Sequence, residues 1–91
     1  MDIAENIKLL DSGKILYFKS SNVVYCLVKQ YGIYRLSYWN DGDWCGEHEI
    51  IENTVTNIMK DNQMTCSLQI VNMWIVGGHD GHSKHNTQIG D

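Results

Sequence analysis

YRLSYWNDGDWCGEHE, residues 34–49, joins aromatic, acidic and metal-ligating side chains in one continuous stretch. Aromatic residues recur from Tyr34 to Trp39, in a pattern that is typical of a β-strand. The next four residues, NDGD at 40–43, are types that tolerate the positive φ angles of a tight turn. The stretch therefore predicts a strand that ends in a turn, with Trp39 and Trp44 on either side of that turn.

The segments before this stretch predict a helix followed by strands. Ile3, Ile7 and Leu10 lie at helical spacing and predict a short amphipathic helix. Asp2 can cap the start of this helix, and Gly13 can end it. Three apolar runs separated by short polar turns then predict strands of an antiparallel meander. These strands cover residues 14–19, 23–30 and 33–39.

Residues 47–60 predict a second helix. Val55, Ile58 and Met59 fall on one helical stripe with the apolar residues at 50 and 51. The β-branched neighbours of Val55 are poor helix formers, and they leave a second interpretation open. In that interpretation the segment is a hairpin that turns at Glu52-Asn53.

Residues 64–76 predict a long final strand. Cys66, Leu68 and Ile70 alternate with polar residues, as expected for a strand with one buried face. From Val71 onward both faces of such a strand are apolar, so this end needs cover from the helix or from a second copy of the chain. A homodimer formed there is a hypothesis that the sequence raises.

Together these elements predict an α+β fold with a short N-terminal helix and an antiparallel meander of about four strands. The further helix precedes the last strand. We expect a single domain at residues 1–76. Residues 77–91 form a polar tail rich in glycine and histidine, and its lack of apolar groups predicts disorder. The tail carries three imidazoles that can ligate a transition metal. They are His79, His82 and His85.

Composition excludes several classes of protein. The formal net charge is −4, and the few Lys and Arg residues are scattered, so we expect no direct binding to nucleic acid. The chain has no run of membrane-spanning length and no basic, apolar N-terminal leader. Three cysteines at irregular spacing favour free thiols in a reducing compartment, so we expect a cytoplasmic protein.

The reactive residue types form only weak chemical motifs. Cys45 and His48 have the spacing of half a zinc site, which Cys66 completes only if the predicted last strand lies alongside. The same pair, with Glu49 orienting the imidazole, resembles a cysteine nucleophile with its base. No phosphate-binding loop or nucleotide-binding signature is present. We therefore expect a protein that is not an enzyme and that needs no cofactor.

The turn and its flanks predict a binding surface, which we call the lip. Aromatic rings supply contact area with few rotatable bonds, and carboxylates steer a basic partner toward that area. At least one of the two Trp rings is expected to belong to the core. The residues of the lip are Tyr38, Trp39, Asp41, Asp43, Trp44, Glu47 and Glu49.

Two short segments carry a family resemblance. LLDSGK at residues 9–14, which ends a helix and leads into a strand, and WIV at 74–76 resemble the start and the end of small phage anti-defence proteins. These are the anti-Thoeris signal sponges, and the resemblance implies a non-catalytic protein that sequesters cyclic ADP-ribose-type signals. The family usually has a Trp soon after the first strand, where this chain reads FKSSN at 18–22. No binding residue follows from the resemblance.

Three functions are consistent with these patterns. The first is a small acidic inhibitor of phage or mobile-element type, whose lip binds a partner protein with a basic surface. The second is an oligomeric sponge for a nucleotide-type signalling molecule, in which aromatic rings stack on the base. The third is a metal-responsive module that uses the histidines of the tail.

Overall fold

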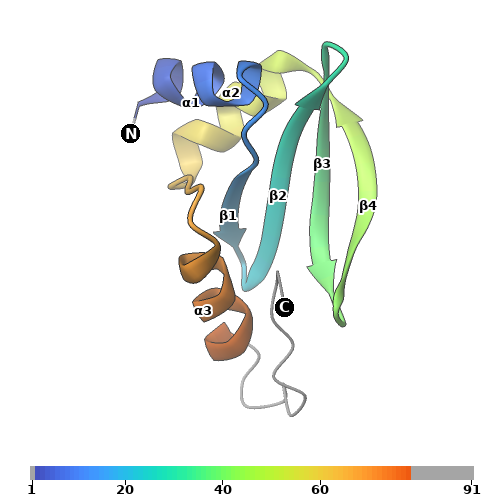
Figure 1. The fold of residues 1–91 in the computed structure, drawn as a ribbon, viewed down its shortest axis with the longest axis vertical. Helices are drawn as coiled ribbons and strands as arrows, with labels where there is room; N and C mark the ends of the chain where they lie inside the picture. Colours follow the sequence, from blue (N-terminus) through green and yellow to red (C-terminus); the bar gives the residue numbers. More distant parts are fainter. Residues whose placement is uncertain (1, 79–91) are drawn as a thin grey trace.

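The computed structural model describes residues 2–78, which contain three helices and four strands (Figure 1). In chain order these elements are α1 (Ile3–Asp11), β1 (Leu16–Ser20), β2 (Val23–Gln30), β3 (Ile33–Asn40), β4 (Asp43–Ile50), α2 (Glu52–Asp61) and α3 (Leu68–Gly78). The α+β class, the N-terminal helix and the antiparallel meander are thereby confirmed. No helix within residues 2–78 is both long and apolar enough to cross a membrane.

Tight turns connect the four strands into one antiparallel sheet, in the order β1-β2-β3-β4. Each turn has two residues with positive φ, as expected for the turns that suit the twist of a hairpin. These turns are Ser21-Asn22, Tyr31-Gly32 and Asp41-Gly42. The local sequence therefore sets both the strand order and the hairpin register.

The start of α1 follows the capping chemistry that its sequence predicts. The Asp2 side chain accepts a hydrogen bond from the Glu5 amide at 2.8 Å, and Gly13 adopts a φ of +91° just beyond the helix. Lys29 Nζ on β2 lies 2.7 Å from Asp11 Oδ1 at the end of α1. This ion pair joins the helix to the sheet.

The prediction of a helix over residues 47–60 is wrong in its first part. Residues 47–50 belong to β4, and α2 begins only at Glu52. The hairpin turning at Glu52-Asn53 is also wrong. From Val55 onward the prediction of a helix is confirmed, because Val55 and Met59 are buried one helical turn apart. The turn at Asp41-Gly42 returns the chain alongside β3, so the residues after it pair as a strand.

The prediction of a final strand over residues 64–76 is wrong. Of this segment only Thr65 pairs as a strand, by two backbone hydrogen bonds to Tyr17, and α3 starts at Leu68. Ser67 Oγ accepts a hydrogen bond from the Ile70 amide at 3.3 Å, as a residue that caps a helix start does. Residues 65–70 alternate like a strand, but the apolar run from Val71 has no period that separates helix from strand, and tertiary packing there favours the helix.

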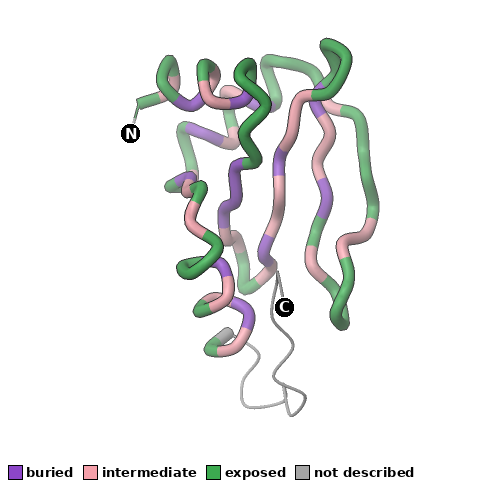
Figure 2. Tube along the Cα trace, in the orientation of Figure 1, coloured by how far each residue is buried: buried purple, intermediate pink, exposed green. Residues whose placement is uncertain are grey.

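Helices cover both faces of the sheet and form two hydrophobic cores (Figure 2). On one face α1 and α2 enclose the larger core. Its buried residues are Leu10, Leu16, Phe18, Leu27, Tyr34, Val55, Met59 and Met64. On the opposite face α3 covers a smaller core. Its buried residues are Tyr17, Val24, Val71 and Ile75.

The two edges of the sheet differ in their cover. At the β1 edge the bridge between Tyr17 and Thr65 continues the sheet for one residue. At the β4 edge no other strand within residues 2–78 pairs with the chain. In Figure 1 the turn end of the β3–β4 hairpin lies on the side of the sheet away from the helices. The hairpin that carries the lip is therefore the open edge of the fold.

Candidate functional site

The two tryptophans of the lip are a cross-strand pair. Trp39 on β3 lies opposite Trp44 on β4, and their rings meet edge to face with centroids 5.1 Å apart. The Trp44 ring also contacts Tyr17, at 5.8 Å between centroids. Both indoles are half-buried and pack against the α3 core. The two rings are therefore part of the packed fold, and each still exposes some of its surface to solvent.

The four carboxylates of the lip are exposed to solvent, in contrast to its indoles. Asp41 lies in the turn, and Asp43 Oδ1 accepts a hydrogen bond from the Trp44 amide at 2.8 Å. Glu49 faces Arg35 across the strands, with 3.8 Å between Glu49 Oε1 and Arg35 Nη2. Because both partners of this pair are solvated, it contributes little to stability. The edge thus keeps a surplus of negative charge.

The pleat divides the lip between the two faces of the sheet. Arg35 and Trp39 lie four residues apart on β3, so their partners Glu49 and Trp44 share the face that α3 covers. Glu47, two residues before Glu49, lies on this face too. Tyr38 points to the opposite face, as the sequence predicts, and it retains 37% of its accessible surface.

A bulge in β4 sets this arrangement. The pairing register shifts between Leu36 and Tyr38, and Gly46 adopts a φ of +90° beside the shift. The Tyr38 ring lies directly over Gly46, where no side chain occupies the space. The bulge bends the edge strand and brings Glu47 back to the face of Trp44. Gly46 itself, which lies just before the segment predicted as a helix, was the sequence signal for the bulge.

Replacing Gly46 by alanine is expected to lower the free energy of unfolding by about 1–3 kcal/mol. The added Cβ would lie 2.7 Å from Tyr38 Cε1, and the backbone would hold an alanine at positive φ. Gly13→Ala is the matched control, because Gly13 has a φ of +91° and open space around its Cβ position. Urea unfolding of both variants measures the difference. Equal losses in the two variants would show that the contact with Tyr38 is unimportant.

The structure does not complete the half zinc site at Cys45 and His48. Cys66 follows Thr65, which pairs with β1, so it lies at the sheet edge opposite Cys45. Within residues 2–78 no group of three His, Cys, Asp or Glu side chains could hold a metal. The prediction of metal ligation by His79, His82 and His85 lies outside the described residues.

Cys26 belongs to β2, which lies between β1 and β3, and it is on the same face of the sheet as Glu47. Burial raises the pKa of the Cys26 thiol, hydrogen bonding to Ser37 lowers it, and the charge of Glu47 raises it again. The net shift is upward, so the thiolate forms only at higher pH than in an ordinary cysteine. Cys66, by contrast, is exposed.

We expect iodoacetamide to alkylate Cys66 much faster than Cys26 at mildly alkaline pH. Burial limits access to Cys26, and its raised pKa lowers the reactive thiolate fraction. A time course followed by peptide mass spectrometry measures both rates. The two rates should converge in denaturant, and equal rates in the native protein would contradict the burial of Cys26.

Comparisons with known proteins show no relationship from which a function could be transferred. No protein-family model, curated protein or solved structure matches the chain. Any function must therefore be argued from the residues themselves. Arg35 and Gly46, which shape the lip through the ion pair and the bulge, were not among the residues predicted for the lip.

Proposed function

We propose that this chain is a non-catalytic binding domain that docks on a basic surface of a partner protein through the lip. The observation that carries the proposal is the open β4 edge, where Glu47 and Glu49 are exposed beside a fixed pair of indoles. An open edge offers unpaired backbone groups, and its charges select what approaches.

The rings and the carboxylates would contribute to binding in different ways. Packing against Tyr17 holds Trp44 in place, so little rotamer freedom is lost when a partner covers its remaining surface. The carboxylates speed the encounter with a cationic surface and reject an acidic one. They also disfavour pairing between two β4 edges, because Glu47 and Glu49 of two copies would repel each other.

A protein partner fits this edge better than a nucleotide does. Phosphate groups need cations, or several amides gathered at a helix N-terminus, at their binding site. The lip has four carboxylates, and its neighbouring cation, Arg35, already faces Glu49. A domain of this kind would act by covering a cationic surface, such as the one with which an enzyme grips nucleic acid. A domain that acts in this way is an inhibitor, and it needs no catalytic group in the lip.

Two parallel measurements test this function. Affinity capture with the full chain from the cells that encode it should retain a protein, and added salt should release that protein. Thermal-shift screening against nucleotides and cyclic nucleotide signals should leave the melting temperature unchanged. A nucleotide that raises the melting temperature in a saturable way would instead support the sponge.

A further inference from the structure

Three apolar side chains gather at the end of the sheet opposite the turn of the lip. Tyr31 lies in the turn between β2 and β3, whereas the turn of the lip lies at the other end of β3 (Figure 1). Ile33 begins β3, and Ile51 follows β4. Because Tyr34 pairs with Ile50, Ile33 and Ile51 are cross-strand neighbours when this register continues by one residue. We call Tyr31, Ile33 and Ile51 the Tyr31 patch.

The Tyr31 patch is open to solvent. Tyr31 retains 99% of its accessible surface, Ile51 69% and Ile33 37%. Single exposed apolar residues are ordinary, but three neighbours form a contiguous surface of the kind that marks an interaction site. No element within residues 2–78 covers the Tyr31 ring.

Tyr31 is poorly suited to the turn that it occupies. Its φ is +53°, in the left-handed region that disfavours bulky side chains and that Asn, Asp and Gly adopt more readily. The turn of the lip has such a residue, Asp41, at the equivalent position. The exposed Tyr31 ring gains no packing in return for this conformation. Stability of the fold therefore does not explain a tyrosine at this position.

Ile51 is poorly suited to its position too. It is the N-cap residue of α2, and its side chain forms no capping hydrogen bond. Ser, Thr, Asp and Asn are preferred there because their oxygen accepts a hydrogen bond from an amide of the first turn, as Asp2 does for α1. Two neighbouring exposed positions thus carry large apolar residues where local structure favours small polar ones. Such local conflicts are expected at functional sites.

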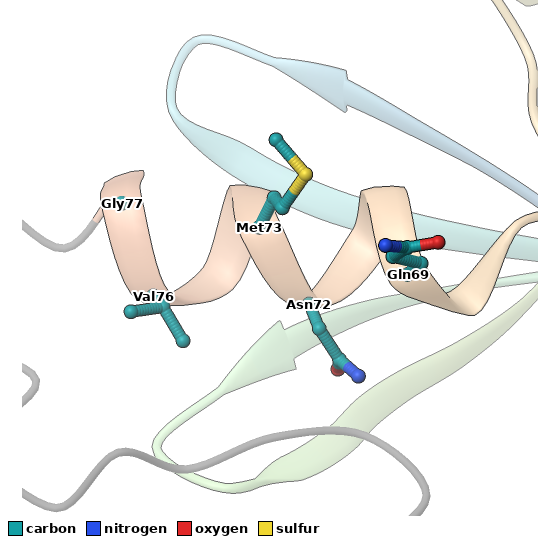
Figure 3. Close-up of a pocket in the computed structure, with 5 residues that line it drawn as sticks. All are labelled: Gln69, Asn72, Met73, Val76 and Gly77. Atoms are coloured by element: carbon teal, nitrogen blue, oxygen red, sulfur yellow. The ribbon is translucent and has the colours of Figure 1, made fainter.

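The hollow along α3 is less accessible than the Tyr31 patch. It has a volume of about 560 Å³ (Figure 3), and two of its lining residues, Asn72 and Val76, already have interaction partners. Val71 and Ile75 are buried against the sheet, so the fold itself covers the apolar run for which the sequence raised a dimer. The residues that line the hollow are Gln69, Asn72, Met73, Val76 and Gly77.

The charges near the Tyr31 patch are balanced. Both ion pairs within residues 2–78 lie at this end of the sheet, and they join Lys29 to Asp11 and Arg35 to Glu49. The whole chain, by contrast, has a formal net charge of −4. Two copies of the chain can therefore meet at the Tyr31 patch without the repulsion that the surplus carboxylates cause at the lip.

We infer that the Tyr31 patch binds the same patch of a second copy, in a two-fold symmetric dimer. Each copy supplies a protruding ring, Tyr31, and an apolar surface beside it, Ile33 and Ile51. A two-fold axis lets Tyr31 of each copy pack on the isoleucines of the other, so one patch provides both halves of the contact. Aromatic anchors of this kind supply much of the binding energy of interfaces.

The size of the patch limits the strength of the dimer. A tyrosine can bury about 150–250 Å², and the two isoleucines add only their exposed parts. The sum is below the ~800 Å² that a stable interface buries on each partner. The dimer is therefore weak, with a dissociation constant of about 10–100 µM. The turn of the lip stays free in it, because that turn lies at the opposite end of β3.

Sedimentation equilibrium of the full chain over a concentration series tests the dimer. The wild type should shift from monomer to dimer, and Tyr31→Asn should weaken this association at least ~10-fold. The same variant should raise the melting temperature of the monomer by about 2–8 °C, because asparagine suits the positive φ of the turn. Melting is followed at low protein concentration, where dimer formation does not contribute.

Ile51→Ser should show the same combination, a weaker dimer and a more stable monomer, because serine can cap α2. Met73→Gln is the matched control, since it removes an exposed apolar side chain from α3, outside the patch, and should leave association within about two-fold of the wild type.

A wild type that stays monomeric up to millimolar concentration would overturn the inference and indicate a different protein as the occupant of the patch. Association that neither Tyr31→Asn nor Ile51→Ser weakens would also overturn it. Loss of stability in both variants would show that the fold itself requires these residues, and it would remove the argument for the dimer. None of these outcomes involves a captured partner, so they do not bear on the proposed function.

Discussion

Val71→Asp is expected to lower the free energy of unfolding by at least ~4 kcal/mol. Val71 is fully buried between α3 and the sheet, so the substitution loses its apolar burial and places a carboxylate in the core without a cation. A domain of this length has a total stability of about 5–14 kcal/mol. The loss is therefore a large part of the total stability, and the urea midpoint of the variant should fall far below that of the wild type.

Met73→Asp is the control that makes this result informative about structure. In a strand, positions 71, 73 and 75 share one face, so Val71→Asp and Met73→Asp would be equally severe. In the helix, Val71 and Ile75 lie one turn apart on the buried side, while Met73 faces solvent. We expect Met73→Asp to change stability by no more than ~0.5 kcal/mol. Urea unfolding at low protein concentration, followed by far-ultraviolet circular dichroism, measures both variants. Similar losses would contradict the helical packing of α3.

Replacing both Glu47 and Glu49 by lysine is expected to lower affinity for the captured partner by about 100-fold. The substitutions turn two attractions into two repulsions on the open edge. Both side chains are exposed, and the pair of Glu49 with Arg35 is a solvated one, so the fold should tolerate the change. Titration calorimetry with the purified partner measures the loss.

The control for this variant carries the same change in net charge elsewhere. Glu5→Lys with Asp61→Lys alters exposed acids on α1 and α2, away from the β4 edge. Affinity of this control should remain within a few-fold of the wild type. If both double variants weakened binding equally, general electrostatic attraction rather than the lip would explain the interaction.

Local chemistry explains how much of the fold the sequence predicted. Turn residues at 21–22, 31–32 and 41–42 fix tight hairpins, and Asp2 and Gly13 mark the ends of α1. These features depend on neighbouring residues alone, so a single sequence contains them. The C-terminal half depends on tertiary packing. Residues 64–70 alternate like a strand, yet the chain forms a helix because Val71 and Ile75 close the second face of the sheet.

In the lip, too, some features follow from the local sequence, and others depend on residues that are distant in the chain. Its turn, its exposed carboxylates and the opposite orientation of Tyr38 follow from residue type and from the two-residue period of a strand. The half-burial of Trp39 and Trp44 does not, because it requires Tyr17 and α3 on the same face. The contact between Gly46 and Tyr38 likewise needed the bulge, which shifts the register by one residue.

The location of the docking surface is best measured by amide hydrogen exchange of the full chain, free and bound to its captured partner. Residues 43–50 form an open edge, so their outward amides should exchange readily in the free protein and slowly in the complex. Peptides from α1 and α2 should keep their rates. Protection confined to the helices, with residues 43–50 unchanged, would contradict the assignment of the lip as the binding surface.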